Sequence, residues 1–205
     1  YFCFSERNFI MDFSLFIPNM IKLWQEYWQL FLLEGLKNTL ILTAISVALG
    51  TVLGALVAMA KMSKHRIIRF LVTVYIEVIR GTPILLQLYV FYFVLPNVLT
   101  FLKLSPFMWV SIALCVNSGA YVSEVIRSGI QAVDKGQMEA ARSLGMSEKQ
   151  AMLKIILPQA VRYVPPAVGN EFIALLKETS VAGYVAVVDV TKAATNIRNK
   201  TYDAV

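Results

Sequence analysis

The chain has 205 residues, 58% of them hydrophobic, and its mean hydropathy is +0.63. This composition is too apolar for the surface of a water-soluble domain and indicates a membrane protein. The 19 Lys and Arg residues outnumber the 13 Asp and Glu residues, but they lie between apolar stretches rather than in one patch, so they indicate membrane topology and not a nucleic acid partner.

Residues 1–30 form an N-terminal segment that we expect to lie as a helix at the membrane interface. Its amphipathic aromatic side chains suit that position: Trp24, Tyr27 and Trp28. Residues 1–10 lack the long apolar core of a signal peptide, so Met11 is a candidate for the native start.

Residues 31–205 are expected to form an all-α transmembrane domain, because helices satisfy their own backbone groups in lipid. A helix that crosses the membrane needs about 20 apolar residues. Three uncharged stretches provide them, within residues 38–60, 81–102 and 104–123. The second span is predicted over residues 67–95, with a kink where Pro83 removes a backbone donor.

A fourth span is predicted over residues 163–188, which are apolar overall. Glu171, Lys177 and Glu178 interrupt it, so it would fail as a helix exposed to lipid.

The distribution of positive charge predicts the orientation of these spans. Residues 61–69 and 135–162 are rich in Lys and Arg and should face the cytoplasm, whereas residues 96–106 hold only Lys103 and suit the outer side. The amino terminus is therefore expected outside.

Residues 128–162 form a loop that is too polar to enter lipid and too long for a simple turn. Asp134 and Ser147 are predicted to cap two short helices, and Gly145 permits a sharp turn between them. Leu157 and Pro158 are predicted to end the second helix.

This loop contains the pattern EAA, three residues, G, nine residues, I, one residue, LP. Its fixed positions are Glu139, Ala140, Ala141, Gly145, Ile155, Leu157 and Pro158. The pattern resembles the signature loop of ABC importer permeases at every fixed position. Residues 77–83, 117–121 and 177–180 are similar to segments of the polar amino-acid permeases, which include the histidine, arginine and glutamine importers, and the chain most resembles the glutamine type.

The resemblance implies the transmembrane domain of a type I ABC importer in the bacterial inner membrane. About four spans are expected here, with a fifth missing from this sequence, and residues 189–203 would then lie outside the membrane. The implied partners are an ATP-binding subunit that receives the loop, an extracytoplasmic solute-binding protein and a second permease subunit, identical or different. ATP and Mg²⁺ would bind the ATPase, because this chain has no glycine-rich phosphate loop, and no metal site or catalytic residue is expected on it.

Polar and ionisable side chains at membrane depth are candidates for the solute path, because burying them in lipid is costly. A zwitterionic amino acid needs an acceptor for its ammonium group and donors for its carboxylate. The candidates are Glu77, Arg80, Thr82, Asn117, Tyr121, Glu124, Lys177, Glu178, Thr179 and Ser180. A structural role stays open, in which Glu77 pairs with Arg80, Glu124 pairs with Arg127, and the neutral residues pack helices together.

Hydropathy alone leaves two other functions open. The chain could be a secondary transporter or channel subunit that uses its buried charges for ion coupling, or a membrane anchor without a path of its own. The signature loop argues against the first alternative.

Overall fold

The computed structural model describes residues 13–185 and 187–201, and within those ranges it contains helices and no strand. The α-helices are α1 (Phe13–Gln29), α2 (Lys37–Lys61), α3 (Arg66–Gly81), α4 (Ile84–Tyr89), α5 (Leu95–Val98), α6 (Pro106–Gln131), α7 (Lys135–Ser143), α8 (Glu148–Ala151), α9 (Leu157–Ala160), α10 (Val164–Glu178) and α11 (Val190–Thr201). π-helical turns lie at Leu30–Leu36, Val90–Val94 and Met152–Ile156, and 3-10 turns at Val161–Tyr163 and Thr179–Val185. The predicted all-α membrane fold is confirmed.

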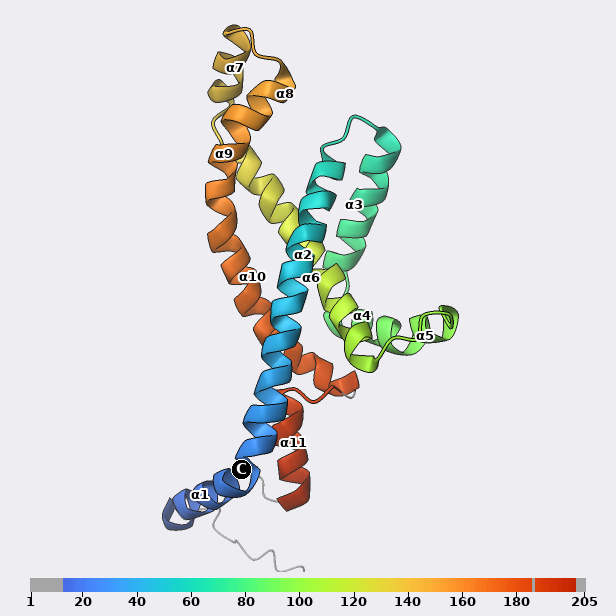
Figure 1. Ribbon diagram of the computed structural model, residues 1–205, viewed down its shortest axis with the longest axis vertical. Coiled ribbons are helices and arrows are strands. Elements are labelled where there is room, and N and C mark those ends of the chain that lie inside the picture. The colour runs from blue at the N-terminus through green and yellow to red at the C-terminus, as the bar shows by residue number, and fades with distance from the viewer. Residues whose placement is uncertain (1–12, 186, 202–205) are drawn as a thin grey trace, which may run out of the picture.

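Two helical segments are long and apolar enough to cross a membrane, Ile17–Lys61 and Pro106–Gln131. The first joins α1 and α2 through a π-helical turn, and Figure 1 shows α1 turned away from the axis of α2. The second begins sharply, because Ser105 Oγ accepts a hydrogen bond from the Met108 amide and Pro106 occupies the first helical turn. The start predicted for the native chain lies outside the described residues.

The predicted second span is broken rather than kinked. Arg66–Gly81 and Ile84–Val98 meet at 108°, and they make a third crossing only if taken together. Thr82 (φ −116°, ψ 145°) and Pro83 (φ −61°, ψ 138°) are both extended, so two successive residues leave the helix. As a result α4 and α5 run sideways from the bundle (Figure 1).

The predicted fourth span corresponds to α10, which has 15 residues and ends in the 3-10 turn Thr179–Val185. By length and composition it does not qualify as a membrane-crossing helix on its own. It is instead the last part of a helical path that begins at α8 and continues through α9.

Leu157 and Pro158 do not end that path, so the predicted helix stop is wrong. Pro158 occupies the first turn of α9, and the helix continues beyond it. A π-helical turn, Met152–Ile156, directly precedes it, and the same arrangement recurs where Val90–Val94 precedes Pro96. The wider turn shifts the carbonyl groups that a proline ring would otherwise meet.

Helices α2 and α6 form the closest packing in the bundle, through glycines on both helices. A Cβ atom on Gly50 would lie 2.7 Å from the side chain of Ser118, and one on Gly54 would lie 2.8 Å from that of Val122. Small residues at such contacts let helix backbones approach closely in a membrane. The adjoining apolar core includes Leu42, Leu88, Leu114 and Leu175.

The molecule is elongated, and its two predicted cytoplasmic connections lie at the same end. Figure 1 shows α7, α8 and the turn between α2 and α3 at that end, with α1 and α11 at the other. Lys64 Nζ of the turn lies 3.7 Å from a carboxylate oxygen of Glu148 in α8. The shared end agrees with a common side of the membrane for both connections.

Adding one methyl group at Gly54 should destabilise the protein, because the new Cβ would overlap Val122. We expect Gly54→Ala to lower the free energy of unfolding by about 1–3 kcal/mol. Gly169→Ala is the matched control within a helix, since no atom lies within 4 Å of its added Cβ, and it should not be destabilising. Equilibrium unfolding in detergent micelles measures both, and equal effects would contradict the packing argument.

Candidate functional site

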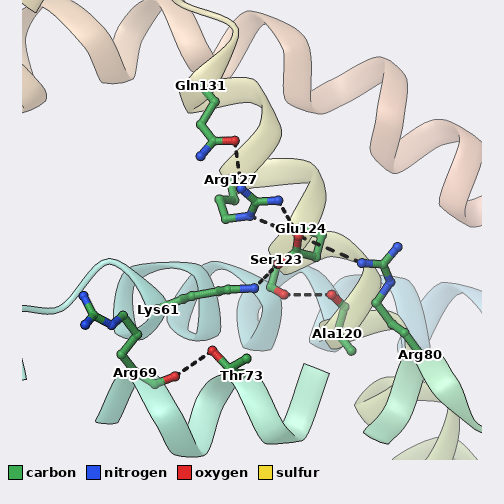
Figure 2. A network of polar contacts seen from close by, with 9 residues as sticks. All are labelled: Lys61, Arg69, Thr73, Arg80, Ala120, Ser123, Glu124, Arg127 and Gln131. Atoms are coloured by element: carbon green, nitrogen blue, oxygen red, sulfur yellow. Dashed lines mark hydrogen bonds and ion pairs between the residues drawn. The ribbon is translucent and has the colours of Figure 1, made fainter. Parts of the chain in front are cut away.

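Glu124 lies at the centre of a cluster of charged side chains (Figure 2). Its Oε1 accepts a hydrogen bond from Lys61 Nζ at 2.6 Å, and its Oε2 accepts two from Arg127, at 2.7 Å from Nη2 and 3.0 Å from Nε. Arg80 Nη1 lies 3.9 Å from Oε2. With 15% of its side chain exposed, this carboxylate is held by three cations. It carries the principal ionic contact of the bundle.

The cluster joins three helices at fixed points. Lys61 is the last residue of α2, Arg80 lies in the last turn of α3, and Glu124 and Arg127 are one turn apart on α6. The Tyr75 hydroxyl of α3 also donates to the Val116 carbonyl of α6 at 2.6 Å. Pairing with one carboxylate offsets part of the positive charge of three cations, which would be costly to leave alone in the bundle.

One of the two ion pairs that the alternative structural role requires is present. Glu124 pairs with Arg127, whereas Arg80 pairs with Glu124 and not with Glu77. Arg80 instead reaches Glu124, and its guanidinium lies 5.2 Å from the centre of the Tyr121 ring. Glu77 is exposed and has no ion pair within the described part of the chain.

A pocket of about 450 Å³ lies beside this cluster, between α6 and α10. Its polar lining comprises Arg80, Tyr121, Glu124, Ser128, Tyr163 and Glu171. The pocket therefore offers a guanidinium group, two carboxylates and several hydroxyl groups within one space. Such a set can bind both ends of a zwitterion.

Thr82 and Asn117 belong to a different polar network, centred on the buried side chain of Gln87. Gln87 Nε2 donates to the Ile79 carbonyl at 2.7 Å and to the Thr82 carbonyl and Oγ1 at 3.1 and 2.9 Å. Its Oε1 accepts from Asn117 Nδ2 at 3.0 Å. The network supplies a donor to carbonyl groups that the break between α3 and α4 leaves without helical partners.

Four further path candidates lie where α10 changes into a 3-10 turn, and none of them lines the pocket beside Glu124. Lys177 is exposed and Glu178 is partly buried. The Thr179 hydroxyl donates to the Leu176 carbonyl at 2.8 Å, and the Ser180 hydroxyl donates to the Lys177 carbonyl at 2.7 Å. Their place in a solute path stays a prediction.

Sequence reasoning missed three residues that the structure places in these networks. In the sequence, Glu171 interrupts an apolar stretch, Lys61 belongs to a basic connection that indicates topology, and Gln87 lies within an uncharged span. A polar side chain inside an apolar stretch was the available signal for Glu171 and Gln87. No local signal pairs Lys61 with Glu124, 63 positions away.

The hairpin of α7 and α8 forms as predicted from its capping residues. Asp134 Oδ1 accepts from the Gly136 amide at 2.7 Å, and Ser147 forms a reciprocal capping box with Gln150. Gly145 adopts φ +84°, a conformation that favours glycine, and so ends α7.

The signature residues of this hairpin differ in exposure. Glu139, Ala140 and Pro158 are exposed, Leu157 is half-buried, and Ala141 is buried with 5% of its surface accessible. The hairpin packs on a small core around Val133, Ile156 and Ala160, with Ile130, Met138, Met152 and Ile155 against it. Of the three residues Glu139, Ala140 and Ala141, only Ala141 is buried, and Leu144 at the end of the same helix is 84% exposed.

Comparison with known proteins gives consistent matches over most of the chain. Residues 50–204 match the family described as binding-protein-dependent transport system inner membrane component. The putative glutamine transport system permease protein of Rickettsia prowazekii is 41% identical over 174 residues, which are 85% of this chain and 79% of that protein. The arginine transport system permease protein of Bacillus subtilis is 39% identical over 193 residues, which are 94% of this chain and 84% of that protein.

Solved structures agree with these matches. The chain is similar to one in the crystal structure of an amino acid ABC transporter with histidines, with 44% identity and a TM-score of 0.83, over 91% of this chain and 84% of that one. An inward-facing structure of the MetNI methionine ABC transporter matches with a TM-score of 0.63 at 18% identity, over 90% of this chain and 88% of that one. The second likeness shows a shared fold.

Removing the carboxylate at the centre of the charged cluster should destabilise the bundle, because three cations would lose their shared partner. We expect Glu124→Gln to lower the free energy of unfolding by about 3 kcal/mol. Glu148→Gln removes the same charge from the exposed pair with Lys64 and should change it by less than about 0.5 kcal/mol. Equilibrium unfolding compares the two variants, and a loss at Glu148 as large as that at Glu124 would refute the role of burial.

Proposed function

We propose that this chain imports polar amino acids with energy from a separate ATPase. The premise is that the chain belongs to the family of binding-protein-dependent transport system inner membrane components and is an amino-acid permease of the ABC importer type. The single observation that carries the coupling part is the projecting hairpin with the signature pattern (Figure 1). The same family membership disfavours a secondary transporter or channel.

The hairpin suits a docking element for an ATPase subunit. Glu139 and Ala140 are exposed, and Leu144 presents an apolar side chain at 84% exposure beside the turn at Gly145. A charged acceptor, a small residue and an exposed apolar group together form a compact contact surface. Because α7 and α8 are capped at both starts and pack on their own core, the surface is preformed.

The pocket beside Glu124 suits the solute path. Its volume of about 450 Å³ lies in the usual range for small-molecule sites. Arg80 can donate to a substrate carboxylate, and Glu171, which forms no ion pair within the described residues, can accept from an ammonium group. Polar amino acids carry both groups, and the glutamine and arginine permeases among the relatives support this substrate class.

The remaining assignments follow from the family. An extracytoplasmic solute-binding protein would deliver the substrate, a second permease subunit would complete the path, and the ATPase subunit would hold ATP and Mg²⁺. The hairpin end, with both basic connections, would face the cytoplasm of a bacterial inner membrane, which puts the amino terminus outside. This chain would itself catalyse no reaction.

The hairpin turn gives a direct test of coupling. Gly145→Val should abolish ATP-driven uptake, because a β-branched residue at φ +84° costs about 1–2 kcal/mol and would change the angle between α7 and α8. Gly145→Asn is the matched variant, since asparagine tolerates this conformation, and it should retain uptake. Uptake into proteoliposomes and copurification of the ATPase subunit measure both.

Two results would contradict this reading. If Gly145→Val kept full uptake, the hairpin geometry would not transmit ATP hydrolysis. If Gly145→Val and Gly145→Asn lost uptake to the same extent, the backbone conformation at this position would not explain the loss.

The pocket gives an independent test of the path. Glu171→Gln should raise the KM for amino-acid uptake about tenfold, because it removes a charged acceptor, while ATPase copurification stays unchanged. Glu26→Gln makes the same change at an exposed position of α1, outside the pocket, and should leave the KM unchanged. Competition among radiolabelled amino acids in the same assay would define the substrate, and equal KM values for both variants would argue against this pocket.

A further inference from the structure

A second pocket, of about 560 Å³, lies where the end of α2, the first turns of α3 and the end of α6 meet. Four of its lining residues are cationic: Lys61, Arg66, Arg69 and Arg127. No carboxylate lines it, and the other lining residues are apolar or neutral. The pocket therefore has a strong excess of positive charge.

Glu124 compensates only part of this charge. It accepts hydrogen bonds from Lys61 and Arg127, whereas Arg66 and Arg69 have no ion pair within the described part of the chain. In Figure 2 the guanidinium group of Arg69 lies away from Glu124, and no interaction is drawn between the two. Two arginines thus remain available to an anion.

These two arginines do not serve the stability of their own helix. Arg66 and Arg69 lie in the first turn of α3, whose exposed amide groups disfavour positive charge. Their position therefore favours an anionic partner from outside α3, bound in this pocket.

Exposed apolar side chains continue from the pocket along α3. Ile67 is 75% exposed, Phe70 67% and Leu71 61%, and Phe70 itself lines the pocket together with Met62 and Ile130. A soluble anion would need the cations but not this apolar surface. A phospholipid needs both, because its phosphate group and its acyl chains are covalently joined.

We propose that this pocket binds the head group of an anionic phospholipid, with Arg66 and Arg69 on the phosphate and the acyl chains along the exposed face of α3. Guanidinium groups bind phosphate oxygens in a bidentate manner. Basic pockets between membrane helices on the cytoplasmic side are suited to anionic lipids. The site is separate from the solute pocket and does not depend on which amino acid is transported.

The test measures lipid binding to the full chain, purified together with the subunits that copurify with it. Phosphatidylglycerol retained through detergent extraction is counted by native mass spectrometry, and its affinity is measured in nanodiscs of phosphatidylcholine with increasing fractions of phosphatidylglycerol. Arg66→Gln combined with Arg69→Gln should weaken phosphatidylglycerol binding about 30-fold, since each cation contributes roughly a factor of five. Lys22→Gln combined with Lys103→Gln removes the same charge from exposed positions outside the pocket and should leave binding unchanged.

The controls separate a lipid site from other anion sites. Arg66→Lys combined with Arg69→Lys keeps both charges but loses the bidentate geometry, so it should bind phosphatidylglycerol more weakly than the native chain and more tightly than the double glutamine variant. The single glutamine variants should each lose about fivefold, which keeps the proposal testable if the double variant does not fold. The proposal would be overturned if the variant with Arg66→Gln and Arg69→Gln bound phosphatidylglycerol as tightly as the control with Lys22→Gln and Lys103→Gln. Binding of inorganic phosphate alone with the affinity of the lipid would also overturn it. So would a double glutamine variant of Arg66 and Arg69 that no longer copurifies with the ATPase subunit but binds lipid unchanged, because the two arginines would then form a protein contact.

Discussion

The architecture depends on the pairing of one carboxylate inside the bundle. Glu124 binds the last residue of α2, a residue in the last turn of α3 and a residue one turn along α6, so a single side chain fixes three helices relative to one another. In a medium that does not solvate charge, a cation released from this cluster would need another partner. Gln87 meets the same constraint for backbone groups, because it donates to carbonyls exposed where α3 breaks from α4. The Glu124 cluster and the Gln87 network together stabilise a bundle in which one span is broken between α3 and α4.

The hairpin is joined to this bundle by apolar packing rather than by charge. The ion pair of Lys64 with Glu148 has 91% and 70% of its side chains exposed, so it contributes little to the connection. Val133 at the end of α6 instead packs with Ile156 and Ala160, which lie on the helical path into α10. Because Pro158 does not interrupt that path, the hairpin is connected to α6 through this packing and to α10 through continuous helix. These are the two helices that enclose the pocket beside Glu124.

Features governed by neighbouring residues could be predicted from the sequence, and features governed by distant ones could not. Asp134, Ser147 and Gly145 act within a few positions, so the two short helices and their turn were predictable. Pro158 also has a local rule, but the π-helical turn before it overrides that rule, so the predicted helix stop failed. Arg80 had a carboxylate three positions away and nevertheless pairs with Glu124, because the packing of α3 on α6 decides which carboxylate it meets.

The charged cluster forms a wall shared by the two pockets. Lys61 and Arg127 line the basic pocket, whereas Arg80 and Glu124 line the pocket proposed for the solute. An anion held by Arg66 and Arg69 would also attract Lys61 and Arg127, the two cations whose hydrogen bonds hold Glu124 at 2.6 and 2.7 Å. A carboxylate that has lost such contacts interacts more strongly with Arg80, and less of the Arg80 charge is then available to a substrate. A ligand in either pocket would therefore act on one side of a single ion-pair cluster, because these four side chains are joined through Glu124.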